Sequence, residues 1–247
     1  MRPRQLFYPP NPDYGTGACR RIIGIASRPG TVDAHLSDNF HEMRCRIRHD
    51  GRIVTAIESE AIRIPTSACP GAASILQELV GIRLDTPKRA LYADGRALRH
   101  CTHLFDLAVL AIGFAPSPPM RTRFEAIVPD ELDAPVFLSI RQDGRIVHRW
   151  LVRDGVIQEP ESLRGNILGK GFAHWASTAF AGSTLDAATI LARTWLIAIG
   201  RQFLTTATAG QPIAVNRDMA GRCFAYSPPH AATAVFLPGH LRSETDL

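Results

Sequence analysis

Two Asp-Gly pairs constrain the fold most, because each stands between segments that alternate apolar and polar side chains. The first lies in IRHDGRIV (47–54) and the second in IRQDGRIV (140–147), and seven of the eight residues agree at an offset of 93. Asp-Gly between alternating segments is the strongest short-range signal for a β-hairpin. The sequence therefore predicts an antiparallel hairpin in each half of the chain, over 41–64 and 135–152.

The likeness of the two hairpins has two explanations. Any Asp-Gly hairpin flanked by Ile, Arg and Val looks similar, so the agreement can be fortuitous. Alternatively, a β-hairpin-plus-helix unit has been duplicated, and the helix expected over 183–203 closes the second copy. The sequence leaves both explanations open.

The remaining periodicities place further elements around these hairpins. Strands are expected over 20–27, 31–38 and 121–128. A helix is expected from Pro70 to the residue before Gly81, with Thr66 or Ser67 as its cap, and a buried helix over 99–115. Ser183 or Thr184 is the expected cap of the helix over 183–203. These elements predict an α+β fold in which helices pack on one face of antiparallel meander sheets.

The expected domain organisation has three parts. Residues 1–18 are rich in Pro, Gly and Tyr and predict an extended arm. Residues 19–206 are expected to form one α+β domain with two pseudo-repeats, 19–116 and 120–206. Residues 207–247 carry four prolines and predict an irregular tail.

Composition narrows the range of partners. The net charge is only +5 and no dense basic run with interleaved aromatics occurs, so no nucleic-acid partner is expected. The longest apolar run, about 104–115, is shorter than the roughly 20 residues of a membrane-spanning helix. Five cysteines without the spacing of a secreted scaffold, and the lack of an apolar stretch behind MRPRQLFYPPNP, predict a reduced cytoplasmic protein. Exposed strand edges favour a homodimer.

Four short segments gather the polar groups that can carry chemistry. They are SDNFH (37–41), Cys69, HCTH (100–103) and Asp106. His103 and Asp106 are three residues apart on an expected helix, so they can hydrogen-bond, and an imidazole oriented by a carboxylate is a common general base. Cys69 and Cys101 stand at expected helix starts, where the helix dipole favours a thiolate.

The same groups also fit other roles. Thiolates with imidazole and carboxylate suit zinc or an iron–sulfur cluster, although no CxxC pair is present. A cysteine inside an intracellular protein is also often only a small core side chain. Proton transfer, metal binding and packing therefore all remain open for this set.

The phrases SDNFH, CPGA and CTHLFDL, followed later by IGRQF (199–203), resemble a bacterial family known as domain of unknown function 2889 over nearly the whole chain. The resemblance implies a proteobacterial catabolic setting. It further implies a lyase that releases formaldehyde from the side chain of a lignin-type aromatic compound.

Residues 43–115 also look like the iron–sulfur scaffold proteins of the NifU-like type. Carried over by position, Cys69, His100 and Cys101 match three ligands of those scaffolds. The fourth thiol would fall near Asp38–His41, where this chain has no cysteine. This resemblance implies a metal-binding protein for zinc or iron, with Asp38 or His41 in the fourth position.

The leading hypothesis is a carbon–carbon lyase that needs no redox cofactor and acts on a small hydrophobic or aromatic substrate. His41, or His103 oriented by Asp106, is the expected base, and Asp38 is its polar partner. The expected walls of the pocket are Phe40, Cys69, Cys101, Phe105, Trp150, Phe172 and Trp175. The alternatives are the metal-binding protein and a binding protein for small ligands without catalysis.

Overall fold

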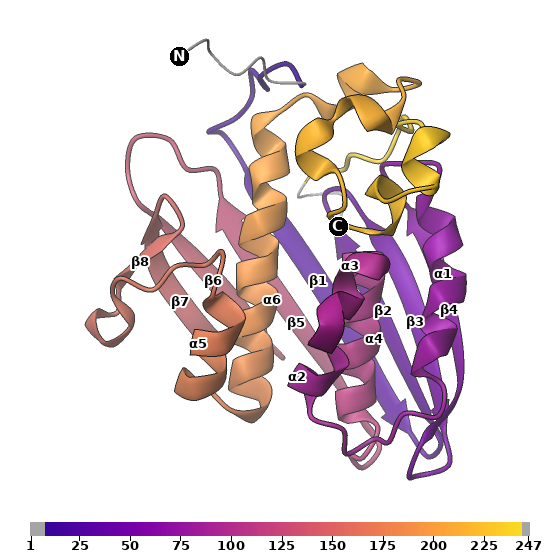
Figure 1. The fold of residues 1–247 in the computed structure, drawn as a ribbon. Coiled ribbons are helices and arrows are strands. Elements are labelled where there is room, and N and C mark those ends of the chain that lie inside the picture. Colours follow the sequence, from indigo (N-terminus) through magenta and orange to yellow (C-terminus); the bar gives the residue numbers. More distant parts are fainter. Residues whose placement is uncertain (1–7, 244–247) are drawn as a thin grey trace. The chain divides into compact units, whose positions relative to one another are not determined.

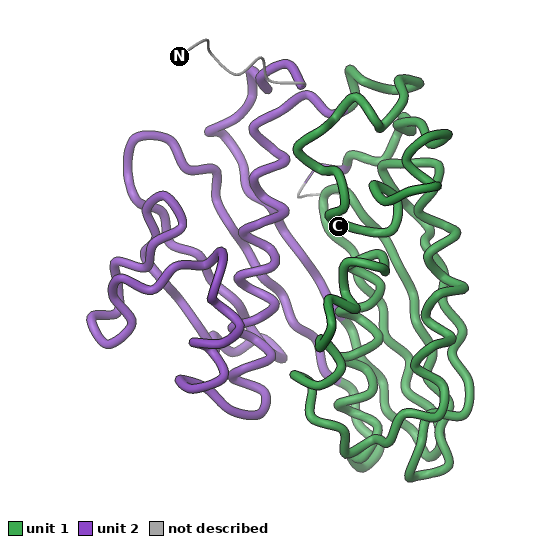
Figure 2. The backbone as a smooth tube through the Cα atoms, in the orientation of Figure 1, with its two compact units in different colours: residues 1–7, 24–121, 206–241 green, residues 8–23, 122–205, 242–247 purple. Residues whose placement is uncertain are grey.

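The computed structural model describes residues 8–243, so the first seven residues of the expected arm and the last four of the expected tail lie outside the described part. The chain divides into two compact units (Figure 2). Unit 1 contains Gly24–Arg121 and Thr206–Leu241, and unit 2 contains Tyr8–Ile23 and Thr122–Thr205.

The predicted α+β class is confirmed. Eight strands form a sheet in the order β4-β3-β2-β1-β5-β6-β7-β8 (Figure 1). The strands are β1 (Ala18–Arg28), β2 (Thr31–Asp38), β3 (Glu42–His49), β4 (Val54–Arg63), β5 (Met120–Pro129), β6 (Val136–Gln142), β7 (Arg145–Arg153) and β8 (Val156–Glu159). The α-helices are α1 (Ala72–Ile75), α2 (Lys88–Leu91), α3 (Arg96–Arg99), α4 (Thr102–Phe114), α5 (Phe172–Ala179) and α6 (Gly182–Ala198).

Each unit builds its core between a helix and its own strands. In unit 1, α4 packs on β2 and β3, and nine of its side chains are buried. In unit 2, α6 packs on β6 and β7. The strands alternate buried and more exposed residues, as in β3, which sets one face of each meander toward the helices.

Both predicted hairpins form, but their turns differ. Asp143 and Gly144 have φ of +52° and +81° and join β6 to β7 directly, as a two-residue turn of the I′ kind does. In the first hairpin only Gly51 has positive φ, and Asp50 Oδ1 accepts hydrogen bonds from Arg52 N and Ile53 N. Pairing of residues 52–54 with residues 81–84 lengthens this turn. The duplicated hairpin-plus-helix unit is not confirmed.

The expected helix over 70–80 is broken into short turns. A 3-10 turn (Cys69–Gly71), α1 and a second 3-10 turn (Leu76–Leu79) follow one another, and Val80 is already extended. The predicted caps are wrong, because no side chain caps the first turn. Thr66 Oγ1 lies 3.1 Å from Cys69 Sγ instead, and Ser67 Oγ accepts a hydrogen bond from Val235 N.

The other expected helices are displaced at their ends. The buried helix starts at Thr102 instead of residue 99, and the long helix of the second half ends at Ala198 and continues as a 3-10 turn to Gln202. No side chain caps α6 either, since Thr184 Oγ1 donates to Ala181 O within the first turn. The irregular tail is seen as five short 3-10 turns between Thr205 and Ala232.

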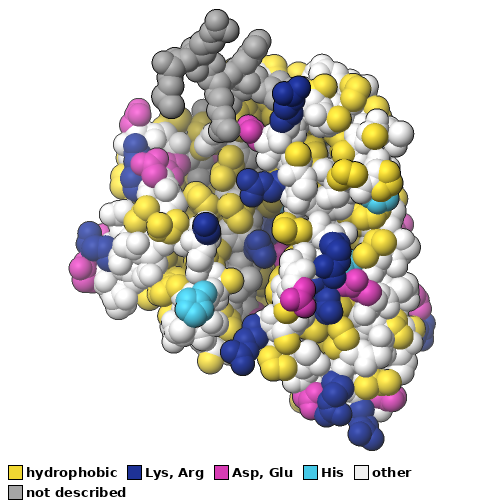
Figure 3. All heavy atoms as spheres, in the orientation of Figure 1, with side chains coloured by type: hydrophobic (Ala, Val, Ile, Leu, Met, Phe, Trp, Pro, Cys, Tyr) yellow, Lys and Arg dark blue, Asp and Glu magenta, His cyan; other side chains and the backbone are white. Residues whose placement is uncertain are grey.

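Charged side chains are interspersed on the face of the molecule in Figure 3, where Lys and Arg lie next to Asp and Glu. On β3 this mixing takes the form of ion pairs: Arg46 Nε lies 2.6 Å from Asp33 Oδ1, and Arg48 NH2 lies 2.9 Å from Glu58 Oε1. Among the described residues, no helix is both long enough and apolar enough to cross a bilayer.

Acid is expected to destabilise unit 2 through His148. Its ring is buried and Nε2 donates a 2.8 Å hydrogen bond to Thr184 O, and burial lowers its pKa below the ordinary value of 6.5. As the pH falls, His148 is therefore protonated in the unfolded chain before it is protonated in the folded chain. Its contribution to the free energy of unfolding is complete above about pH 6.5 and is lost as the pH falls through the pKa of the folded state.

Urea unfolding at about pH 7.5 and about pH 5 tests this prediction. The free energy of unfolding should fall with acid in the wild type and fall less in His148→Gln, whose amide keeps a donor for Thr184 O. An equal fall in both proteins would contradict it.

Candidate functional site

The turn between β2 and β3 builds an oriented carboxylate. Asp38 N donates to His41 O at 2.8 Å, which closes the turn over Asn39 and Phe40. Asp38 Oδ1 accepts hydrogen bonds from Phe40 N and His41 N, each at 2.9 Å. Aspartate favours such turns because its side chain can bond to the backbone two or three residues ahead. The Asp38 side chain is fully buried, so its carboxylate is fixed in place.

Asp38 orients the imidazole of His41. His41 Nδ1 lies 3.0 Å from Asp38 Oδ1, and the His41 side chain is only 9% exposed. Because a carboxylate accepts, Nδ1 carries the proton and the lone pair is left on Nε2. Asp38 and His41, called the dyad below, therefore have the arrangement of a general base with its orienting acid. The sequence predicted His41 as one candidate base with Asp38 as its polar partner, and His103 oriented by Asp106 as the other.

A second imidazole lies against the dyad. The ring of His103, in the first turn of α4, stacks on His41 with centroids 4.0 Å apart and planes inclined by 26°. The stack therefore places a second ionisable ring directly against the base of the dyad. Asp106 accepts a 2.7 Å hydrogen bond from Tyr92 Oη.

Sequence reasoning missed two residues of this site. Arg63, at the end of β4, is 9% exposed, and its guanidinium donates to Asp38 O at 2.6 Å and to His41 O at 2.9 Å. His240, in the C-terminal segment, is 2% exposed, and its ring centroid lies 6.4 Å from that of Phe40. Neither residue belongs to a recognisable motif, and only the folded chain brings them to the turn.

The thiols do not have the reactivity expected at helix starts. Burial raises the pKa of the Cys69 thiol, and it also raises the pKa values of Cys101 and Cys223. The neighbouring thiols add to this increase for Cys101. Burial thus outweighs the effect of the helix start, and the thiol form is favoured. Buried Cys45 behaves in the same way, with its pKa raised to about 12.

His100 is buried in a polar network. Its Nε2 lies 2.9 Å from Glu78 Oε1, which also lies 3.1 Å from Arg96 Nε, and its ring stacks on Phe105 at 4.7 Å. The other ring nitrogen of His100 is buried and makes no hydrogen bond within the described chain. Across residues 8–243, no three His, Cys, Asp or Glu side chains are arranged to hold a metal ion. Metal binding by Cys69, Cys101 and His100 stays a prediction.

The expected aromatic walls of the second half form a cluster within unit 2. Trp150 is 1% exposed, and its ring lies 6.2 Å from Phe172 and 6.4 Å from Phe180. Trp175 packs edge-on against Phe172 and Phe180, at 5.4 and 5.7 Å. These rings join α5 and the residue that follows it to β7. Trp150 and Phe172 are buried as core side chains are, whereas Trp175 and Phe180 are partly exposed. In unit 1, Phe40 and Phe105 are also buried.

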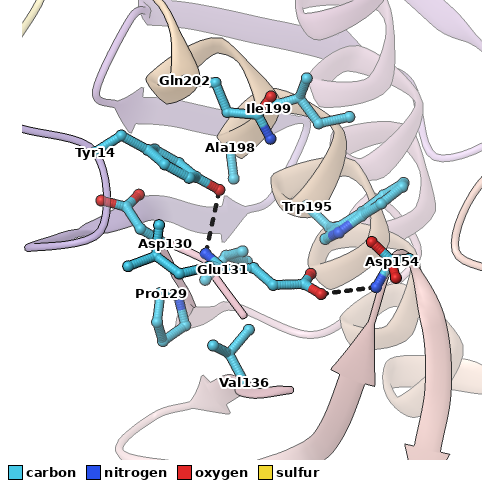
Figure 4. A pocket seen from close by; sticks show the side chains of 12 residues that line it. Tyr14, Pro129, Asp130, Glu131, Val136, Asp154, Trp195, Ala198, Ile199 and Gln202 are labelled. Carbon is cyan, nitrogen blue, oxygen red and sulfur yellow. Dashed lines mark hydrogen bonds between the residues drawn. The ribbon is translucent and has the colours of Figure 1, made fainter. Parts of the chain in front are cut away.

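Unit 2 also has a cavity of about 300 Å³, shown in Figure 4. Trp195 and Asp154 lie on one side of the view, and Tyr14 and Asp130 lie on the other. Twelve residues line it: Tyr14, Val128, Pro129, Asp130, Glu131, Leu132, Val136, Asp154, Trp195, Ala198, Ile199 and Gln202. Apolar walls with a few placed polar groups are typical of small-molecule sites.

The polar groups of this cavity are mutually oriented. Asp130 forms a two-point ion pair with Arg201 at 2.6 and 2.8 Å, and its carboxylate accepts hydrogen bonds from Gly15 N and Gly17 N. Glu131 N donates to Tyr14 Oη at 3.1 Å, which leaves the Tyr14 hydroxyl proton for another acceptor. The arm thus forms one wall of the cavity.

A larger cavity of about 490 Å³ lies in unit 1. The rings of Phe224 and His230 stack at 3.8 Å along it, and Ala68 and Gly71 line it on either side of Cys69 in the sequence. Its other lining residues are Ser67, Ser74, Ile75, Thr233 and Ala234.

Comparison with known proteins finds a match for part of the chain. No curated protein matches it. A family model matches the segment that contains β2, β3, β4 and nearly all of α4, and with them the dyad, Arg63 and His103. The match is shorter than the resemblance expected over nearly the whole chain, and the similarity to iron–sulfur scaffolds stays a prediction. Residues 27–113 match the model of the family described as protein of unknown function (DUF2889).

Proposed function

We propose that the protein is an acid–base carbon–carbon lyase that releases formaldehyde from the hydroxymethyl side chain of a lignin-type aromatic compound. The observation that carries the proposal is the buried Asp38–His41 dyad with a second imidazole, His103, stacked on it at 4.0 Å. A fixed base and a neighbouring acid are the two groups that such a cleavage needs.

The chemistry balances without an electron donor or acceptor. His41 Nε2 takes the proton of the hydroxymethyl group, and the oxygen forms the carbonyl of formaldehyde as the C–C bond breaks. The released electron pair forms a carbon–carbon double bond to the next carbon, which must carry a hydroxyl leaving group. Protonated His103 gives its proton to this hydroxyl, which leaves as water. The products are formaldehyde, water and an alkene conjugated with the aromatic ring.

The surroundings of the dyad favour this role. Asp38 stabilises the charge that His41 acquires when it takes the proton, because its carboxylate is buried and cannot turn away. Phe40 is 6% exposed and stands between the two members of the dyad in the sequence, so it gives the turn an apolar side. General acid–base catalysis by placed groups typically contributes about 10²–10⁴-fold in rate.

A pair of substrates tests the proposal. A diaryl-1,3-propanediol, which has the hydroxymethyl group and the leaving hydroxyl, should give the ultraviolet absorbance of a stilbene. The matched compound with methyl in place of hydroxymethyl should give none, because it has no hydroxymethyl proton for His41 to take and no group that can leave as formaldehyde. Equal reaction of both compounds, or of neither, would contradict the proposal. Elemental analysis of the same sample tests the metal-binding prediction, since zinc or iron should then be stoichiometric and disappear in Cys69→Ser.

A second candidate function is binding of a small amine without catalysis, and the cavity of Figure 4 favours it. Trp195 and Tyr14 offer aromatic faces, and Glu131 and Asp154 offer carboxylates. Arg153 Nε lies 3.6 Å from Glu131 Oε1 and 3.2 Å from Asp154 Oδ2, so an amine would share these carboxylates with Arg153. The C-terminal end of α6, at Ala198, adds the negative end of its dipole. Aromatic faces with nearby negative charge suit an organic cation.

Titration with benzylamine, followed by Trp fluorescence, tests this candidate, and benzyl alcohol is the neutral control. Glu131→Gln keeps an acceptor for Asp154 N but loses the charge, so affinity should fall by roughly 10-fold or more. Equal affinity of wild type and variant, or equal binding of the alcohol, would contradict the amine site.

A further inference from the structure

We infer that the C-terminal clasp, defined as residues 235–240, is a working part of the dyad site, and that Arg63 and His240 are its positioning residues. The inference rests on the proposed function. It assigns the geometry of the dyad to a segment far outside the family match of residues 27–113.

The clasp lies alongside the chain that follows β4. Ser67 N donates to Val235 O at 2.9 Å, and Leu237 N donates to Pro65 O at 2.9 Å. Thr66 and Phe236 form an isolated antiparallel bridge between these two bonds. Backbone pairing on this scale fixes the register of the clasp, so His240 arrives at one defined place.

Arg63 joins the clasp to the dyad. NH1 donates to His240 O at 2.6 Å and to Asn39 O at 3.2 Å. NH2 donates to Asp38 O at 2.6 Å and to His41 O at 2.9 Å, and it lies 3.4 Å from Ser37 Oγ. One buried guanidinium therefore holds three carbonyls of the turn and one of the clasp. Arginine suits this task because its donors have fixed directions in one plane.

The clasp also supplies an imidazole beside the turn. His240 Nδ1 donates to Leu237 O at 2.8 Å, which fixes the orientation of the ring. Burial lowers the pKa of His240, and the nearby His41 and Arg63 lower it further. The charged and titratable groups that act on it are thus His41 and Arg63. The ring of His240 is neutral and packs beside Phe40 without adding charge.

Through these contacts, the position of the turn depends on the position of the clasp. Displacing the clasp would remove one of the four carbonyl partners of a buried guanidinium, which is costly, and Arg63 would then be free to shift against the carbonyls of Asp38 and His41. The Asp38–His41 hydrogen bond would lose its support although both side chains are intact. A misplacement of about 1 Å in a catalytic group can cost about 10²-fold in rate.

The test compares Arg63→Lys and His240→Ala with Arg44→Lys, a matched control on the exposed face of β3. Proton NMR of the full chain follows the imidazole proton shared by His41 and Asp38, identified by its loss in His41→Ala. We expect this resonance to shift or to vanish through solvent exchange in both site variants and to stay in the control. We also expect kcat to fall about 10²-fold in Arg63→Lys, with KM changed by less than about threefold.

The outcomes separate this inference from the proposed function. An unchanged resonance in His240→Ala and in any folded Arg63→Lys protein would overturn the inference, whether or not the wild type is a lyase. If the resonance shifts in the two variants but the wild type has no lyase activity, the result would support the inference and remove the proposed reaction. If Arg63→Lys does not fold, the resonance in His240→Ala decides, because this variant loses the ring beside Phe40 and its bond to Leu237 O but should still fold, since it keeps the backbone carbonyl that Arg63 contacts.

Discussion

Replacement of His41 with alanine should lower kcat by about 10²–10⁴-fold while the protein keeps its fold. His41 is the ring that Asp38 orients at 3.0 Å, so its loss removes the base and leaves the carboxylate held by the backbone of the turn. Alkene formation from the diol measures the effect, and circular dichroism checks the fold. His103→Ala should also lower kcat, because the leaving hydroxyl then has no acid beside it.

The control for this prediction is His35→Ala. His35 is on β2, shortly before the turn that holds His41. Its side chain is 43% exposed and pairs with Glu42 across the strands, so its removal should change kcat little. Full activity in both His41→Ala and His103→Ala would contradict the assignment. A similar loss in all three variants would point to a general effect of histidine removal and would also count against it.

The largest effect on stability is expected from Trp150→Ala, which should lower the free energy of unfolding by about 3–5 kcal/mol. Trp150 is 1% exposed and contacts the rings of Phe172 and Phe180, so the variant loses buried area and leaves a cavity. Guanidinium unfolding measures the change. Trp175→Ala, at a less buried position, should cost clearly less.

This prediction also bears on the expected substrate walls. If Trp150 contacts substrate, its replacement should raise KM in the folded protein. If it only joins α5 and Phe180 to β7, KM should stay near the wild-type value while stability falls. A stable Trp150→Ala protein with unchanged unfolding would contradict its role in the core of unit 2.

The fold was predictable where the signal is local. Asp143 and Gly144 adopt the positive φ that their pairing favours, and the apolar run of α4 becomes a buried helix. The first Asp-Gly turn shows where local signals stop: the same residues adopt another turn because 52–54 pair with 81–84. The expected helix over 70–80 breaks for a similar reason, since its cap candidates Thr66 and Ser67 bond to Cys69 and Val235.

In the candidate site, too, contacts between residues close in the sequence were predictable, and contacts between distant residues were not. Asp38 and His41 are three residues apart, so their pairing needs only the turn that holds them. The stacking of His103 on His41 depends on how α4 packs over β2 and β3, which no spacing in the sequence reveals. Arg63 and His240 are 177 residues apart and meet through one hydrogen bond. Such a contact is a property of the folded chain.

The most direct test of the central claim labels the hydroxymethyl carbon of the diol with ¹³C and follows its fate by NMR. If the dyad cleaves the side chain, the label should leave as formaldehyde hydrate, with one equivalent formed for each alkene by wild-type protein and none by His41→Ala. Retention of the label in the aromatic product, or equal release by His41→Ala, would contradict the claim.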